Sequence, residues 1–449
     1  MIEFLTLFLG IVAGPQEVAL LADPQVTRVE LRLDGDTVAK AEGSPWEMEI
    51  NLGAVPLPHL LEAVGFDSDG DEVGRARQFL NVPRPSAEVS LILRRGVGDG
   101  LEAQLAWENA TGTSPTAKTV ILDEKEVPIL EGDRVDLSGI DPRQLHVLQA
   151  ELWFPDLSSA RGHLVFGGEY VDETSAELTA WPVALAKGSA KVSDMDRWFV
   201  SDGAPLRVVA VEKGLASLLI VRAPGVSKRL QSLIGVPQSS PQGQSSGIGP
   251  IQGRIDSSPA DLQKNAVSFG DDTRIRLVAP RALKSAGRQV DFDLFSVSPE
   301  IRARQGGLFW ILSQEVQVGG VTSKVRLQDA VTLAGLQAAG TDHRRAVLLI
   351  LAAAWEDSSR FEVATVRRYL TSLNVPLIVW QLGDDAPVAA AWGAIENMSS
   401  FGDLKRAWRS LEKSLNRQRI VWLEGLHLPN AVEIAPDARV ESVVDDNQP

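Results

Sequence analysis

The chain has 449 residues, of which 44% are hydrophobic, and it carries a formal net charge of −15. This length is enough for about three globular domains at roughly 150 residues each. The acidic balance argues against binding to nucleic acid or to an anionic membrane surface, because both attract basic patches. There is no cysteine, which excludes disulfides, thiolate metal sites and cysteine nucleophiles. The five histidines form no HExxH or other short-range pair, so the sequence offers little for zinc hydrolysis.

The first residues, MIEFLTLFLGIVAGPQ, allow two interpretations. Residues 4–13 have the length of the apolar part of a secretory signal, but Glu3 precedes them and no Lys or Arg comes before Arg28. The same residues could instead form a first β-strand. Both interpretations stay open. No later segment reaches the roughly 18 apolar residues that a membrane span needs.

Alternating apolar and polar residues predict β-strands through most of the first 220 residues. VTRVELRLDGDTVAK alternates and then turns at Asp34-Gly35, which is a strong hairpin signal. WEMEINLG alternates again, and two further strands flank an acidic turn around Gly70. These are the parts of a small β-sandwich.

This pattern occurs twice. INLGAVPLPHLLEAVGFDSDG has a counterpart in VDLSGIDPRQLHVLQAELWFPDLSS further along the chain. In both, a hydrophobic–Asx–Leu triplet leads through a proline-containing turn into a strand with a histidine, His59 or His146. The repeat predicts two tandem all-β sandwiches, over residues 1–84 and 85–168.

The first copy resembles bacterial immunoglobulin-like domains. Their consensus reads VxxVExxxDG, then a Pro-aromatic strand start, then HxLxAxAxDxxG. The matching residues are Val29, Glu30, Asp34, Gly35, Pro45, Trp46, His59, Leu61, Ala63, Asp67 and Gly70.

A change of pattern follows the two sandwiches. Residues 169–214 are predicted to be a β-rich connector. Residues 236–258 begin with VPQSSPQGQSSGIGPIQG, an uncharged stretch rich in Pro, Ser, Gln and Gly that predicts a flexible loop. Regular structure resumes at FGDDTRIRLVAP, with a strand from about Arg274 to Val278.

Strands then alternate with helices. The segments GGLFWILSQEVQ and SKVRLQDAVTLAGLQAAG predict helices, and RRAVLLILAAAWEDSS predicts a strand buried on both faces. A helix announced by Ser359 and Glu362 follows at capping-box spacing. Then come the strand VPLIVWQLG, the helix DLKRAWRSLEKSLN and the strand RIVWLEGL. This alternation predicts a doubly wound parallel sheet. The second of these helices places one set of apolar residues on one face: Leu327, Ala330, Val331, Ala334 and Ala338.

Residues 215–425 resemble a von Willebrand factor type A domain. The segments that carry the resemblance are SLLIVRAPGVS, FGDDTRIRLV, GGVTSKVRLQDAVTLAGLQAA and RRAVLLILAAAWED. The whole chain resembles acidobacterial proteins in which immunoglobulin-like repeats precede such a domain. The resemblance implies an α/β, Rossmann-like fold followed by a tail at 426–449. It also favours a secreted, periplasmic or cell-surface location and a protein partner.

In that family a divalent ion at the end of the sheet captures a carboxylate from the partner. The ion is held by a DxSxS motif, a Thr from a later loop and an Asp at the end of another strand. The resemblance places the motif on Ala223, Gly225 and Ser227, the Thr on Thr322, and the final Asp on Leu351 or Ala352. Both metal-neutralising carboxylates are therefore missing. Mg²⁺ is usually held through one or two carboxylates, so Ser227 and Thr322 alone should not retain it. We expect neither metal nor cofactor.

The segment after the alanines could supply a replacement acid and nucleophile in Asp357 and Ser358. Their position just before a predicted helix favours capping of that helix instead. Trp355 lies where the metal loop would be, and an exposed aromatic there could anchor an interface. The expected rim of the degenerate site therefore consists of Ser227, Thr322, Trp355, Glu356 and Asp357.

The sequence predicts a non-enzymatic interaction or scaffold protein, since no nucleophile elbow, phosphate-binding loop or dinucleotide fingerprint is present. One alternative is a divalent-metal-dependent adhesion protein in which other acids substitute: Asp271, Asp272, Glu356 or Asp357. A second is a cryptic hydrolase whose acid–base pair is assembled only by the fold.

Overall fold

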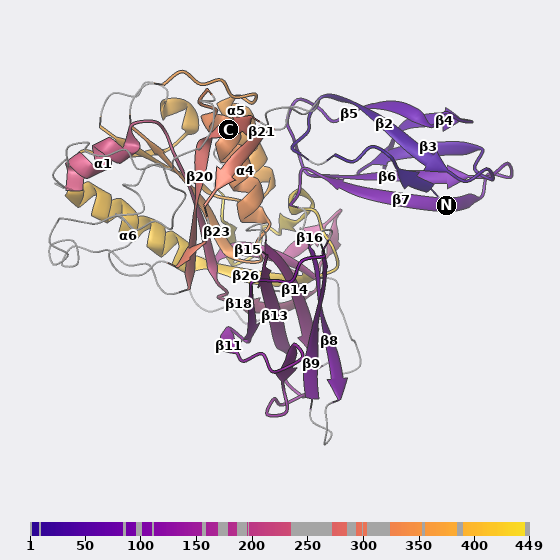
Figure 1. The fold of residues 1–449 in the computed structure, drawn as a ribbon, viewed down its shortest axis with the longest axis horizontal. Helices are drawn as coiled ribbons and strands as arrows, with labels where there is room; N and C mark the ends of the chain where they lie inside the picture. Colours follow the sequence, from indigo (N-terminus) through magenta and orange to yellow (C-terminus); the bar gives the residue numbers. More distant parts are fainter. Residues whose placement is uncertain are drawn as a thin grey trace.

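The structure of the protein is a computed structural model that describes most of the chain (Figure 1). The described residues are 2–8, 10–83, 87–95, 101–109, 112–154, 159–168, 178–185, 195, 197–234, 272–284, 293–298, 300–302, 324–352, 355–383 and 389–444. Several sequence predictions lie outside them: the loop at 236–258, the helix GGLFWILSQEVQ, and the residues Thr322 and Asp271.

The first sandwich packs a three-stranded sheet, in the order β1-β2-β5, on a four-stranded sheet, in the order β4-β3-β6-β7. The strands are β1 (Ile2–Phe4), β2 (Pro15–Ala22), β3 (Arg28–Leu33), β4 (Asp36–Glu42), β5 (Glu47–Asn51), β6 (His59–Phe66) and β7 (Glu72–Leu80). In β5, Met48 and Ile50 are buried while the residues on either side are exposed. The predicted two-residue period therefore fills the core between the sheets.

The second sandwich repeats this arrangement strand for strand. Its sheets have the orders β12-β9-β8 and β11-β10-β13-β14, so β8 to β14 correspond in order to β1 to β7. The strands are β8 (Ala87–Arg95), β9 (Leu101–Asn109), β10 (Ala117–Leu122), β11 (Lys125–Val127), β12 (Arg134–Asp136), β13 (His146–Trp153) and β14 (Ser159–Phe166). The immunoglobulin-like β-sandwich character that the sequence predicts is confirmed.

An Asp and His pair occupies the same place in each sandwich. Asp34 follows β3 with φ 52°, and its carboxylate contacts His59 Nδ1 at 2.6 Å and accepts the next backbone N–H at 2.8 Å. Asp123 follows β10 with φ 45° and makes the same contacts with His146, at 2.6 and 3.0 Å. Asp tolerates this left-handed conformation better than most residues. The repeated histidine therefore ties a hairpin turn to the neighbouring strand.

A third sheet contains the parallel strands, in the order β21-β20-β19-β23-β24-β25. Strands β20, β19, β23, β24 and β25 run parallel, whereas β21 and β22 pair antiparallel with β20. The bounds are β19 (Ala216–Arg222), β20 (Thr273–Lys284), β21 (Asp293–Val297), β22 (Ile301–Arg302), β23 (Arg344–Leu351), β24 (Leu377–Leu382) and β25 (Ile395–Met398). We call the side where the parallel strands begin the amino edge, and the side where they end the carboxyl edge.

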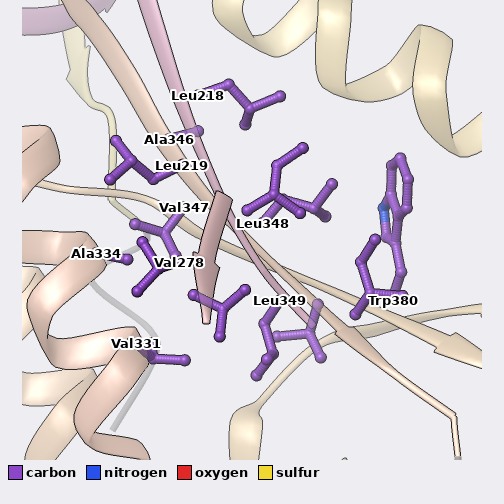
Figure 2. Packing of buried hydrophobic residues seen from close by; sticks show 14 of the residues in the cluster. Leu218, Leu219, Val278, Val331, Ala334, Ala346, Val347, Leu348, Leu349 and Trp380 are labelled. Atoms are coloured by element: carbon purple, nitrogen blue, oxygen red, sulfur yellow. The ribbon is translucent and has the colours of Figure 1, made fainter. Parts of the chain in front are cut away.

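Helices cover both faces of this sheet. They are α1 (Val226–Ile234), α4 (Leu327–Ala339), α5 (Val363–Ser372) and α6 (Phe401–Arg417), with a short 3-10 helix η2 (Ala389–Trp392). Figure 2 shows Val331 and Ala334 of α4 on one side of the strands and Trp380 of β24 on the other. There Trp380 meets Trp408 of α6 edge to face, with ring centroids 5.8 Å apart. None of the helices in the described part of the chain is long and apolar enough to cross a bilayer.

Two predictions for these elements are confirmed. The apolar residues predicted for one face of α4 are all buried. Every residue of β23 is also buried, as expected for a central parallel strand.

The prediction that RIVWLEGL joins the parallel sheet is wrong. This segment forms β26 (Gln418–Glu424), which lies in a separate sheet of order β18-β26-β15-β28. Its partners there are β15 (Leu178–Leu185), β18 (Val208–Glu212) and β28 (Val440–Ser442). Antiparallel pairing with β15 and β18 satisfies both edges of β26, whereas the parallel sheet would leave one edge unpaired.

This separate sheet joins the segments that the sequence divides into a connector and a tail. A small sheet of order β17-β16-β27 joins them again. Its strands are β16 (Phe199–Ser201), β17 (Ala204–Pro205) and β27 (Glu433–Ile434), the last preceded by a 3-10 helix η3 (Pro429–Ala431). The two segments therefore build one unit between the sandwiches and the parallel sheet.

The first sandwich contacts the helical side of the parallel sheet. The buried Tyr369 hydroxyl of α5 donates to Asn81 O at 2.9 Å, just after β7. Arg360 donates to Ile11 O at 3.2 Å. These bonds link chain segments about three hundred residues apart, so the first sandwich has a defined contact with the parallel sheet and its helices.

We expect Asp34→Ala to loosen the first sandwich. The change leaves the buried His59 and a backbone N–H without their acceptor, and it removes a residue suited to positive φ, so the local free energy of opening should fall by about 1–3 kcal/mol. Hydrogen exchange of the β3 and β6 amides in the full chain measures this. Asp36→Ala, at an exposed position two residues on, is the control. Equal effects of both changes would contradict the role of the pair.

Candidate functional site

The carboxyl edge, where the sequence predicts the degenerate metal site, carries a buried arginine. Strand β19 ends at Arg222, and a turn through Gly225, with φ 83°, leads into α1. Arg222 Nη1 donates to Ser227 Oγ at 3.4 Å. Ala223, which takes the place of the family's first Asp, is buried and donates its N–H to Ile350 O at 2.8 Å. A guanidinium therefore contacts the hydroxyl that the family resemblance places at the metal-facing position of the motif.

A second arginine lies at the same edge. A Cβ placed on Gly383, directly after β24, would lie 4.0 Å from the guanidinium carbon of Arg229 on α1. Arg222 and Arg229 therefore place two guanidinium groups near the ends of β19 and β24.

Asp357 is committed to three N–H donors. It accepts from Leu327 N at 3.2 Å, from Ser359 N at 2.8 Å and from the Trp355 indole at 3.2 Å. Leu327 is the first residue of α4, so this carboxylate binds a free amide at the start of that helix. The expectation that Asp357 caps the next helix is therefore wrong, because its acceptor oxygens meet α4 instead.

Asp329 of α4 makes the return contact. Its buried carboxylate accepts from Arg360 N at 3.0 Å and from Phe361 N at 3.2 Å, while its own N–H donates to Ser359 Oγ at 3.3 Å. The loop 355–361 and the start of α4 thus hold each other through two aspartates. The predicted capping box of Ser359 and Glu362 is wrong for the same reason, and α5 has Glu362 at its N-cap with no side-chain hydrogen bond.

The structure separates the predicted site residues. Ser227 lies beside Arg222, whereas Trp355 and Asp357 lie in the loop after β23. Trp355 is partly buried against the core rather than exposed as expected, and Glu356 is exposed. Asp357 and Trp355 form one hydrogen-bonded unit.

Asp272, offered as a substitute metal ligand, lies at the opposite edge of the sheet. It directly precedes β20 and pairs with Lys213 at 2.8 Å and with Arg344 at 2.6 Å. Burial opposes ionisation, but these two cations hold the pKa of Asp272 below its usual value. Asp272 cannot serve a site at the carboxyl edge.

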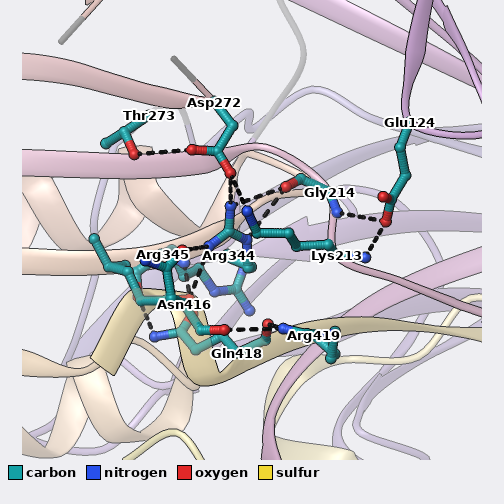
Figure 3. Close-up of polar contacts among 11 residues, drawn as sticks. Glu124, Lys213, Gly214, Asp272, Thr273, Arg344, Arg345, Asn416, Gln418 and Arg419 are labelled. Carbon is teal, nitrogen blue, oxygen red and sulfur yellow. Dashed lines mark hydrogen bonds and ion pairs between the residues drawn. The ribbon is translucent and has the colours of Figure 1, made fainter. Parts of the chain in front are cut away.

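Two arginines at the start of β23 dominate the amino edge (Figure 3). Arg344 donates to Gly214 O at 3.1 and 3.2 Å and to Leu415 O, near the end of α6, at 2.9 Å. Its side chain is 1% exposed. The sequence shows the pair only as the charged start of a strand, so their role was not predicted.

Arg345 serves two more helix ends. It donates to Ala339 O, the last residue of α4, at 3.1 Å, and to Leu373 O and Asn374 O beyond α5, both at 3.3 Å. Burial lowers the pKa of Arg345 to about 10, so it stays protonated at neutral pH. Together Arg344 and Arg345 bind carbonyls at the ends of three helices.

The described residues of the carboxyl edge do not fit a hard divalent cation. Mg²⁺ needs oxygen ligands with negative charge, yet Ser227 already accepts from a guanidinium and Asp357 from three N–H groups. A cation near Arg222 would also meet repulsion on the order of several kcal/mol. Among the described residues no cluster of three or more Asp, Glu or His side chains could hold a metal.

In the part of the chain that the structure describes, the Asp and His pairs of the sandwiches come nearest to hydrolase geometry. Each matches the orienting half of a Ser-His-Asp triad. The outer ring nitrogen of His59 is buried without a hydrogen-bond partner, and that of His146 contacts Asp141 O at 2.9 Å. In the described residues neither ring nitrogen therefore meets a nucleophile.

No family model matches the chain, and no curated protein matches it. Among solved structures, the fibronectin(III)-like modules of Clostridium thermocellum CbhA share 16% identity, with 18% of this chain and 92% of that chain covered and a TM-score of 0.16. Proximal thread matrix protein 1 from the mussel byssus shares 10%, covering 52% and 50% with a TM-score of 0.26. The human COPII-coat protein Sec24c shares 8%, covering 77% and 58% with a TM-score of 0.26. Likenesses this low carry no argument about function.

Arg345→Met should destabilise the protein strongly. The change leaves buried carbonyls of two helix ends without a donor, so we expect a loss of at least about 3 kcal/mol. Arg368→Met, at an exposed position of α5, is the control and should change stability by less than about 0.5 kcal/mol. Urea unfolding of the full chain followed by circular dichroism measures both. A similar midpoint for the two variants would refute the proposed capping role.

Asp357→Ala should weaken the start of α4. Loss of the acceptor for Leu327 N and for the Trp355 indole should lower stability by about 1–2 kcal/mol, as for other lost N-caps. The exposed neighbour gives the matched control, because Glu356→Ala removes a carboxylate without these contacts. The same urea experiment separates them, and a comparable loss in both variants would mean that charge rather than capping matters.

Proposed function

We propose that the protein is a non-enzymatic interaction or scaffold protein whose parallel sheet is a degenerate, metal-free von Willebrand factor A-like domain. The observation that supports this is the contact between Arg222 and Ser227 at the carboxyl edge. A positive charge of the protein lies where the family resemblance implies a metal ion. In this proposal the parallel sheet is retained, while the residues that would hold the ion are replaced.

The arrangement of the sandwiches is consistent with a scaffold. Tyr369 fixes the first sandwich through Asn81, and Arg276 of β20 holds the second by packing over the Trp153 ring at 4.7 Å. A partner would therefore meet surfaces with a set relative position. The expected rim residues Trp355 and Glu356 belong to this proposal, with Glu356 the exposed member.

The metal-dependent adhesion alternative rests on Glu356 and Asp357, the two acids of the described loop 355–361 after β23. For Asp357 to bind a metal it would have to release its N–H donors. The hydrolase alternative has no described nucleophile beside either His–Asp pair, so no specific observation favours it.

Titration with Mg²⁺, Mn²⁺ and Ca²⁺ tests the proposal. Calorimetry should show no saturable heat, and the melting temperature should not rise, because a ligand that binds the native state stabilises it by mass action. Saturable binding with a raised melting temperature would overturn the metal-free assignment. Glu356→Gln and Asp357→Asn would then show which carboxylate holds the ion, with Asp272→Asn as the control at the other edge.

A further inference from the structure

One outer face of the second sandwich is covered by the rest of the molecule. Side chains of β13 and β14 alternate between the sandwich core and this face, which we call the seat. Register places the seat residues in cross-strand pairs: Val147 with Val165, Gln149 with His163, Glu151 with Arg161, and Trp153 with Ser159. The seat therefore begins with an apolar pair, continues through a polar and a charged pair, and ends with a tryptophan opposite a serine.

Each end of the seat has its own partner. The apolar pair packs with Ile420 and Trp422 of β26 in one buried cluster. At the other end, Arg276 of β20 lies over the Trp153 ring and donates to Ser159 Oγ at 3.5 Å. The seat thus joins the second sandwich both to the β26 sheet and to the parallel sheet.

Glu212, the last residue of β18, lies between these ends. Its Oε1 accepts from Gln149 Nε2 of the sandwich at 2.6 Å and from Trp422 Nε1 of β26 at 3.0 Å. The His163 ring packs on Trp422 with centroids 5.0 Å apart. One carboxyl oxygen therefore bridges the second sandwich and the β26 sheet through two neutral donors.

Other charged groups around Glu212 offer little compensation. Glu124, in the hairpin after β10, accepts from Lys213 N and from Gly214 N and brings a second carboxylate close. Asp342, before β23, adds further negative charge. Lys213, which directly follows β18, has its Nζ paired with Asp272.

The strands that pack on Glu212 add few charges of their own. Arg419, next to the residue of β26 that pairs with Glu212, donates to Asn416 O and Gln418 O. From the sandwich, His163 is the cross-strand partner of Gln149 in the seat, and its ring packs on Trp422.

We infer that Glu212 makes the docking of the second sandwich pH-dependent. The protonated carboxyl fits against the seat, whereas the ionised carboxylate weakens the docking. The neutral acid keeps both hydrogen bonds at Oε1, whereas the anion adds a second charge beside Glu124 in a largely enclosed place. Glu212 lies where the second sandwich meets the β26 sheet. Its ionisation therefore affects the contact between these two parts rather than the core of either.

The direction of the pKa agrees with this geometry. Burial raises the pKa of Glu212 to about 7, against the lowering effect of the hydrogen bonds from Trp422 and Gln149, and Glu124 and Asp342 raise it further. The pKa of Glu212 in the docked protein thus lies above 4.5, the value for a free side chain. Docking is therefore favoured most below pH 4.5, where the carboxyl is protonated in both the docked and the undocked state. That advantage is lost as the pH rises towards 7. Undocking should then increase about 70-fold between pH 5 and pH 8.5.

Thiol labelling can measure undocking, since the chain has no cysteine of its own. Val165→Cys places a thiol in the covered apolar pair of the seat, at a position that is 1% exposed. Phe79→Cys is the matched control, because Phe79 holds the equivalent position in β7 of the first sandwich and is 40% exposed. The ratio of the two labelling rates in full-length protein removes the ordinary pH dependence of the thiol.

We expect this ratio to rise about 70-fold from pH 5 to pH 8.5, and to stay flat when Glu212→Gln is added to both chains. The amide keeps an acceptor at Oε1 and cannot ionise. Glu424→Gln, an exposed acid at the end of β26, should leave the rise unchanged. An equal rise with and without Glu212→Gln, or no rise in the parent pair, would overturn the inference.

Two further variants keep the test decisive if Glu212→Gln fails to fold. Gln149→Leu removes a donor that favours the carboxylate, so the midpoint of the rise should move to higher pH. Glu124→Gln removes the neighbouring charge and should move the midpoint to lower pH. Shifts in the opposite directions, or unchanged midpoints in both, would also refute the role of Glu212.

Discussion

The parallel sheet depends on two adjacent arginines at the start of β23. Helices α4, α5 and α6 all end at the amino edge, and the last carbonyls of a helix have no partner within it. Arg345 donates to the ends of α4 and α5, and Arg344 to the end of α6. Buried cations are costly unless they are fully hydrogen-bonded, and the carbonyl ends of helices carry partial negative charge. The arginines and the helix ends therefore each remove the other's burial penalty, and neither would be tolerable alone.

The two sandwiches share one architecture but differ in what covers the same face. In the first, Arg28 lies over the Phe66 ring at 4.5 Å, so the sandwich covers its own aromatic residue. Register places Ala117 of the second sandwich at the position of Arg28, opposite Trp153. The missing guanidinium is supplied from outside by Arg276 of β20. The alanine at this position of the second sandwich thus leaves room for an arginine of the parallel sheet. This difference helps to explain why the parallel sheet covers this face of the second sandwich and not the same face of the first.

Local patterns predicted the elements, but not their partners across the chain. Two-residue periodicity and the His59 and His146 repeat predict the sandwiches. The pairing of these histidines with Asp34 and Asp123 is not predicted, because the LDG and LDE turns lie more than twenty residues earlier in the chain. Strand β26 was assigned to the wrong sheet, since a buried strand pattern does not specify its neighbours. The carboxylate of Asp357 was assigned to the nearest helix, whereas it binds one that starts thirty residues before it. Hydrogen bonds between distant segments decided each of these cases.

The metal motif shows the same limit at the level of chemistry. Comparison with a family motif reveals which ligands are missing, but not what takes over their charge. Here Arg222 is adjacent to the first motif position and was passed over, because the motif assigns it no role. If the carboxyl edge is metal-free as we propose, a partner carboxylate cannot be captured through a bridging ion. Recognition would then rest on shape and on weaker polar contacts, for which a fixed arrangement of domains matters more than a single strong ligand bond. A titratable junction such as that at Glu212 would in that case act on recognition by changing the arrangement itself.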